Sequence, residues 1–110
     1  MNPYLILGAA ILAELFGTTA LNLSSGFTRP LPSVGVVVGY GVSFYLVSLV
    51  LEDLPIGLVY GTWSAVGIVG IAAIGVVAFD EPVDLAGLLG IALIGAGVYV
   101  LNVVSGMSAH

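Results

Sequence analysis

The sequence has no cysteine, and its only histidine is the last of 110 residues, His110. Without cysteine there can be no disulfide, no thiolate nucleophile and no Cys-ligated metal. Without an internal histidine, a Ser–His or Cys–His pair lacks its base, and a transition-metal site lacks its usual ligands. The composition therefore predicts a protein that is not an enzyme and that binds no metal or cofactor.

Basic residues are almost absent as well. Arg29 is the only Lys or Arg, against six acids, and the formal net charge is −5. Nucleic acid requires a basic surface on its partner, so we do not expect nucleic acid among the partners. The acidic excess also hints at adaptation to high salt, which screens surplus negative charge; neutral loss of lysine is the alternative.

Apolar residues, in contrast, dominate the chain. Hydrophobic residues make up 60% of it and charged residues 6%, whereas soluble domains carry about 25% charged residues. The apolar residues gather in four segments. Each is close to the roughly 20 residues that cross about 30 Å of hydrocarbon, and short stretches with proline and charge separate the segments. We expect one all-α integral membrane domain over residues 1–110, multi-pass in the cell (plasma) membrane, with four transmembrane helices at about residues 4–21, 33–51, 56–79 and 85–104.

Glu14 is the one acid inside an apolar segment. It lies about ten residues into the first helix, near the bilayer midplane, where a charged acid costs at least about 2.5–3.5 kcal/mol. None of the four segments contains a Lys, Arg or His, so its counter-charge must be a proton or a cation from outside. We predict that Glu14 binds protons and cations; the alternative is a permanently protonated side chain that hydrogen-bonds between helices.

The predicted cation pocket extends from the face of the first helix that carries Glu14. At 100° per residue, this face also carries Leu7, Ala10, Ile11, Gly17 and Thr18. The small residues among them leave space for a ligand or, equally, for close packing of a neighbouring helix.

Aromatic rings supply the other candidate walls, because ring faces attract a desolvated cation. Tyr60 and Trp63 share a face of the third segment, and Tyr40 and Phe44 share a face of the second. Tyr4 near the N-terminus is a further candidate. Anchoring at the membrane interface is the alternative for these rings.

The last segment carries a possible contact between copies of the chain. Gly90 and Gly97 lie one heptad apart, which gives a stripe for tight helix contact. Dimerisation and packing within the chain are both open. Asn102 is either a helix cap or a hydrogen-bonding group between helices.

These residues resemble the small multidrug resistance family, and its multidrug branch in particular, from Met1 to about Asn102. The motifs that carry the resemblance are Met1-Asn2-Pro3-Tyr4, Ala13-Glu14, Gly17-Thr18-Thr19, Ser25-Gly26-Phe27-Thr28-Arg29, Pro32-Ser33-Val34-Gly35, Ser43-Phe44, Pro55, Gly57, Tyr60, Trp63-Ser64, Val66-Gly67-Ile68 and Asp84. The chain departs from the family pattern at Asn22 and Pro82, where the family has basic residues, and at Ala65, where the family has a glycine.

The resemblance implies proton-coupled export of aromatic or quaternary ammonium cations by an antiparallel homodimer. Protons and drug would compete for the two copies of Glu14. The resemblance places Tyr4, Tyr40, Tyr60 and Trp63 in the site, and Gly90 and Gly97 in the dimer-forming helix.

Three other functions compete with this hypothesis. The first is export of guanidinium-type small cations by the same family, against which Tyr4 and Tyr40 argue. The second is a proton-carrying rotor subunit, although such subunits are typically hairpins. The third is a membrane assembly factor with a structural Glu14. Orientation is open, because Arg29 is the only loop residue that the positive-inside rule counts: either copies insert both ways, or loop acids or a partner settle one orientation.

Overall fold

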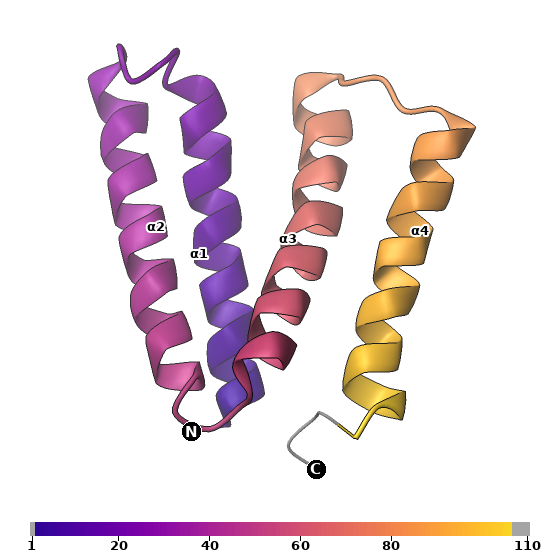
Figure 1. Ribbon diagram of the computed structural model, residues 1–110. Coiled ribbons are helices and arrows are strands. Elements are labelled where there is room, and N and C mark those ends of the chain that lie inside the picture. Colours follow the sequence, from indigo (N-terminus) through magenta and orange to yellow (C-terminus); the bar gives the residue numbers. More distant parts are fainter. Residues whose placement is uncertain (1, 107–110) are drawn as a thin grey trace. The chain divides into compact units, whose positions relative to one another are not determined.

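The computed structural model describes residues 2–106, and all of its regular structure is helical. The helices are α1 (Pro3–Leu23), α2 (Pro30–Val50), α3 (Ile56–Phe79) and α4 (Leu85–Tyr99), and α4 continues into a π-helical turn, η1 (Val100–Val104) (Figure 1). By length and composition, the four spans Pro3–Leu23, Pro30–Val50, Ile56–Phe79 and Leu85–Val104 can cross a membrane. The chain forms two units, which divide after Asp53: one holds α1 and α2, the other α3, α4 and η1. His110 lies outside the described residues.

Capping residues define where helices begin. The Asn2 side chain accepts a 2.8 Å hydrogen bond from the Tyr4 N–H, and Pro3 follows at the first helical position. Asp84 caps α4 in the same way, through a 2.7 Å bond from the Gly87 N–H.

The connection between α1 and α2 is shorter than the sequence predicts. The prediction that this loop runs on to Pro32 and that the second helix begins at about residue 33 was wrong, since α2 begins at Pro30. Proline is compatible with the first helical turn, where the missing N–H has no intrahelical partner in any case. The ranges of α3 and of α4 with η1 coincide with the predicted segments.

The turn between α1 and α2 is built around the buried Ser24. Its hydroxyl donates to the Leu21 carbonyl (2.8 Å) and accepts from the Phe27 N–H (3.1 Å). These bonds hold Ser25, Gly26 and Phe27 at positive φ values of 49°, 70° and 66°, a region in which only glycine is unstrained. The chain thus reverses within a few residues and places Arg29 at the end of the hairpin.

The two helices of this hairpin touch through glycines. A Cβ placed on Gly39 would lie 2.7 Å from the Gly17 Cα and 2.9 Å from the Ala13 carbonyl oxygen. One turn away along α2, a Cβ on Gly35 would lie 3.2 Å from the Ala20 Cβ. Small residues of this kind let helices approach closely enough for backbone contact, which is how helices associate in lipid.

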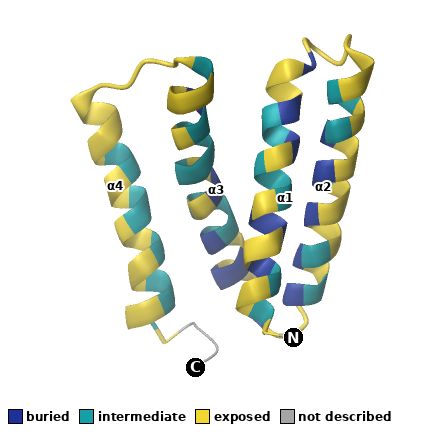
Figure 2. Ribbon diagram, turned by 180° about the vertical axis from the view of Figure 1, so that it is seen from behind, coloured by how far each residue is buried: buried dark blue, intermediate teal, exposed yellow. Residues whose placement is uncertain are grey.

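The second hairpin is packed more loosely. α3 ends at Phe79 and is capped by Asp80 in the left-handed conformation (φ 51°). The Glu81 N–H donates to the Gly75 carbonyl at 3.0 Å, as in a Schellman-type helix end. α4 has no buried residue (Figure 2), and Leu85 is 83% exposed. Lipid or another protein surface must therefore cover the apolar face of α4.

Candidate cation site

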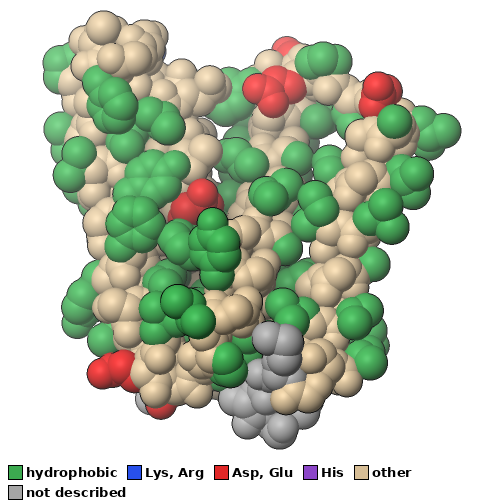
Figure 3. All heavy atoms as spheres, in the orientation of Figure 1, with side chains coloured by type: hydrophobic (Ala, Val, Ile, Leu, Met, Phe, Trp, Pro, Cys, Tyr) green, Lys and Arg blue, Asp and Glu red, His purple; other side chains and the backbone are tan. Residues whose placement is uncertain are grey.

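Glu14 lies about halfway along α1, and its two carboxylate oxygens differ in their surroundings. Oε1 accepts a 3.1 Å hydrogen bond from the Thr18 hydroxyl. Oε2 is buried and has no hydrogen-bond partner within residues 2–106. Figure 3 shows an acidic side chain among apolar ones partway along the helices, while other acids lie at helix ends. A buried carboxylate oxygen without a partner is unfavourable, so Oε2 is the atom that a proton or a cation would satisfy.

Thr18 connects Glu14 to the neighbouring helix. Its Oγ1 lies 2.6 Å from the Tyr40 hydroxyl oxygen on α2. A threonine hydroxyl carries one hydrogen, which is used in the bond to Glu14. When Glu14 is ionised and the Thr18 hydrogen is directed to it, the Tyr40 hydroxyl donates to Thr18. A protonated Glu14 carries its own donor, so the hydroxyl orientations of Thr18 and Tyr40 are linked to the protonation of Glu14.

The predicted face of α1 is largely enclosed. Leu7, Ala10, Ile11 and Gly17 are buried, with exposures of 3%, 0% and 7% for the first three, and Thr18 is half-buried. The space at Gly17 is filled by α2, because a Cβ there would lie 3.2 Å from the Tyr40 backbone nitrogen. At Gly17 the structure thus favours the packing alternative over room for a ligand.

The aromatic candidates form ring pairs within each hairpin. Tyr40 and Phe44 stack on α2, with centroids 6.0 Å apart and planes at 27°. On α3, Tyr60 and Trp63 meet edge-to-face at 6.2 Å and 76°. Tyr4 lies in the first turn of α1 and is 37% exposed.

The glycines of α4 predicted as a dimer contact have open surroundings. A Cβ on either Gly90 or Gly97 would meet no atom within 4 Å. Packing within the described part of their own unit therefore does not explain these two glycines, and they are open to a contact with another surface.

Thr62 is a buried polar residue that the sequence analysis missed. It accepts a 2.9 Å hydrogen bond from the Asn102 amide, which also donates to the Val98 carbonyl at 2.9 Å. Asn102 thus joins η1 to α3. Of the two predicted roles, a helix cap or a hydrogen-bonding group between helices, this is the second. A threonine one residue before Trp63 in a mostly apolar helix was the available signal.

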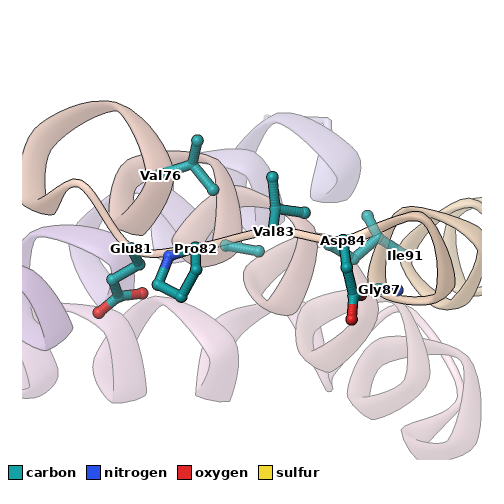
Figure 4. A pocket seen from close by; sticks show the side chains of 8 residues that line it. Val76, Glu81, Pro82, Val83, Asp84, Gly87 and Ile91 are labelled. Atoms are coloured by element: carbon teal, nitrogen blue, oxygen red, sulfur yellow. Dashed lines mark hydrogen bonds between the residues drawn. The ribbon is translucent and has the colours of Figure 1, made fainter.

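The loop acids of the second hairpin have structural roles. Glu81 and Asp84 line a pocket of about 350 Å³ between α3 and α4 (Figure 4). The Glu81 carboxylate lies over Gly75, and Asp84 caps α4. Neither acid belongs to the predicted cation site: the Asp84 side chain caps α4, and the backbone N–H of Glu81 bonds the Gly75 carbonyl at the end of α3.

Four helices that can cross a membrane and a carboxyl group inside one of them define a class: multi-pass membrane proteins with an ionisable intramembrane site, the arrangement found in transporters. The sequence profile described as Small Multidrug Resistance protein matches residues 2–94. The chain is 46% identical to the multidrug transporter EmrE of Escherichia coli (strain K12) and 44% identical to the quaternary ammonium compound-resistance protein QacE of Escherichia coli, with full coverage of both proteins in each case. It is 46% identical to the multidrug resistance protein EbrB of Bacillus licheniformis over 93% of this chain and 86% of that protein.

The chain therefore belongs to the small multidrug resistance family. It is a multi-pass protein of the cell membrane.

Proposed function

We propose that this protein is a proton-coupled antiporter that exports aromatic or quaternary ammonium cations, as a multidrug efflux transporter. The observation that carries the proposal is the buried Oε2 of Glu14, which has no partner among the described residues. Membership of the family and the names of its relatives support efflux of several drugs. The position of the carboxyl group supports the coupling to protons.

The proposed mechanism is exchange at Glu14. When the site faces outward, protons bind the carboxylate and displace the cation. When it faces inward, the protons leave and the next cation binds. In a dimer, protons and the cation would compete for the two copies of Glu14.

The proposed substrate pocket combines apolar residues and rings. The buried Leu7, Ala10 and Ile11 would exclude water around the carboxylate, which strengthens its attraction for a cation. We propose that the predicted rings contact the cation through their faces: Tyr4, Tyr40, Phe44, Tyr60 and Trp63.

The proposed assembly is an antiparallel homodimer. Transporters commonly place their site between inverted repeats, and two copies in opposite orientations supply such repeats from one sequence. The exposed apolar surface of α4 and the open positions Gly90 and Gly97 support a contact with a second copy. The lone base Arg29 gives only a weak orientation signal.

Transport in proteoliposomes with an imposed pH gradient tests the function. We expect Glu14→Gln to abolish both proton-driven cation uptake and proton release on cation binding, because an amide cannot exchange a proton. Glu14→Asp keeps a carboxylate and should retain part of the binding with a changed pH dependence. The matched control is Glu52→Gln, which removes an exposed loop acid and should transport normally. Proton-driven uptake by the Glu14→Gln variant would refute the proposal, and transport of guanidinium alone would assign the chain to the small-cation alternative.

A reporter at the C-terminus tests the orientation. We expect comparable amounts on both sides of the membrane. Lysines at Pro82 and Val83 lie on the same side as Arg29 and should strengthen one orientation; these positions leave the turn residues Asp80 and Glu81 intact. Lysines at Glu52 and Asp53 oppose Arg29 and should favour the other orientation.

Each variant of fixed orientation should transport poorly alone, and co-expression of the two should restore transport. The control replaces the same residues with glutamine, which adds no Lys or Arg for the positive-inside rule to count. Full transport by either fixed variant alone would contradict the antiparallel dimer without affecting the role of Glu14.

A further inference from the structure

An apolar groove runs along the α1–α2 hairpin and has a volume of about 440 Å³. Its walls are Phe16, Ala20 and Leu23 on α1 and Leu31, Val34 and Val38 on α2. Gly35 lies at the base of the groove, where α1 and α2 pack closely, since a Cβ there would lie 3.2 Å from the Ala20 Cβ and 3.5 Å from the Phe16 ring. No residue that lines the groove is polar, so its occupant is apolar over this length.

Arg29, the only Lys or Arg of the chain, lies at one end of this groove. Nη1 of Arg29 donates a 3.3 Å hydrogen bond to the carbonyl of Leu23, which itself lines the groove. A guanidinium has five N–H donors, so the exposed Arg29 keeps donors for a further acceptor. Pro30 and Pro32 have no backbone N–H to offer an anion, and the guanidinium of Arg29 is the charged donor at this end.

The acids of this hairpin lie elsewhere. Glu14 is halfway along α1, and Glu52 and Asp53 follow the far end of α2. The loop end of the hairpin is therefore its positive end. An anionic group is favoured there, whereas it would be repelled at the opposite end.

The dimensions of the groove fit one leaflet of a bilayer. The α1 wall spans Phe16 to Leu23, which is about 10 Å at 1.5 Å per residue. Half of the hydrocarbon core is about 15 Å thick. The groove thus leads from a charged end at the interface into the apolar part of a single leaflet, the path of an acyl chain below its headgroup.

We propose that this groove binds an anionic phospholipid, with an acyl chain between α1 and α2 and the phosphate at Arg29. The groove supplies the apolar contact and Arg29 supplies the preference for negative charge. A zwitterionic phospholipid offers the same chain but no net charge, so it should bind more weakly.

A single tryptophan in the groove tests the proposal. The reporter protein carries Phe16→Trp together with Trp63→Phe, so that its only tryptophan lines the groove. It is reconstituted in two kinds of phosphatidylcholine vesicle. One contains phosphatidylglycerol with brominated acyl chains, and the other contains the same mole fraction of phosphatidylcholine with brominated acyl chains. The quenching of tryptophan fluorescence is compared between the two. We expect phosphatidylglycerol to be preferred about fivefold, the effect of one basic residue near an anionic surface.

Two pairs of variants separate the headgroup from the chain. Arg29→Gln should reduce the preference to about one, and Arg29→Lys should retain it, because lysine keeps the charge. Val38→Phe fills the groove and should weaken quenching by both brominated lipids. The matched control is Val37→Phe, an exposed position on the same helix outside the groove, which should not change quenching. Circular dichroism verifies that each variant keeps its helical content.

Three results would overturn the proposal. Equal quenching by both lipids in the reporter protein would exclude the preference for anionic lipid. An unchanged preference in Arg29→Gln would remove Arg29 from the site. Identical quenching in Val38→Phe and Val37→Phe would show that the chain does not lie in the groove.

Discussion

Replacing Gly39 by alanine should force α1 and α2 apart. The new Cβ would lie 2.7 Å from the Gly17 Cα and 2.8 Å from the Gly17 nitrogen. Both contacts are with backbone, which cannot rotate away as a side chain can. Ordinary carbon contacts are about 3.5–4.0 Å, so the helices must separate by about 1 Å. Overpacking of this kind destabilises by about 1–3 kcal/mol.

The matched control is Gly41→Ala on the same helix, where a Cβ meets nothing within 4 Å. Both variants gain the helix propensity of alanine, about 1 kcal/mol, so the difference between them isolates the contact. We expect Gly39→Ala to be less stable than Gly41→Ala by about 1–3 kcal/mol, measured by loss of helical circular dichroism as sodium dodecyl sulfate is added to mixed micelles. Equal stability of the two variants would refute the backbone contact between α1 and α2.

The same displacement should reach the cation site. The bond between Thr18 and Tyr40 is 2.6 Å long, and a separation of about 1 Å would take it beyond the limit of about 3.0 Å for hydroxyl pairs. Gly39→Ala should therefore also change the pH dependence of cation binding. An unchanged pH dependence alongside the loss of stability would show that the helices separate elsewhere.

Two further substitutions test the site itself. Thr18→Val removes the hydroxyl that donates to Glu14; the carboxylate then loses a hydrogen-bond donor that positions it, so cation binding at a fixed pH should weaken severalfold, as measured by equilibrium binding. Thr18→Ser keeps the hydroxyl and should retain the affinity, and an equal loss in both variants would contradict a role for the hydroxyl. Trp63→Ala should weaken the binding of a planar aromatic cation by about 1–2 kcal/mol, through the lost cation–π contact and apolar area, while Trp63→Phe should lose less. Unchanged affinity for that cation in Trp63→Ala would assign Trp63 to membrane anchoring.

The sequence predicts the helices well because length and apolarity decide them. The range of α3 coincides with the prediction, since Pro55 precedes it and acids follow it. The start of α2 was missed because the effect of proline depends on its position. Proline breaks a helix when it lies in the helix interior, but it is compatible with the first turn of a helix. Patterns of composition do not distinguish these cases, whereas the backbone bond from Ser33 to the Arg29 carbonyl does.

The contacts of the site were harder to predict. Helical periodicity places Thr18 beside Glu14, because residues four apart share a face. It does not give the register of α1 against α2, and so it could not pair Thr18 with Tyr40. That register is set by the contact between Gly17 and Gly39, and the sequence alone left Gly17 open between packing and ligand space.

The difference in packing between the hairpins bears on how exchange can work. A carboxyl group that holds a proton and a cation in turn must keep its own geometry while access to it changes. The glycine contact keeps α1 against α2, and with it the chain of hydroxyls from Tyr40 through Thr18 to Glu14. This hairpin is therefore suited to move as one body, because any separation of its helices breaks the hydrogen bonds that link Tyr40, Thr18 and Glu14. α4 has no buried residue, and within its own unit the bond from Asn102 to Thr62 ties its η1 end to α3. Under the proposed exchange, alternating access should thus leave the α1–α2 contact intact, and a cross-link between α1 and α2 should permit transport.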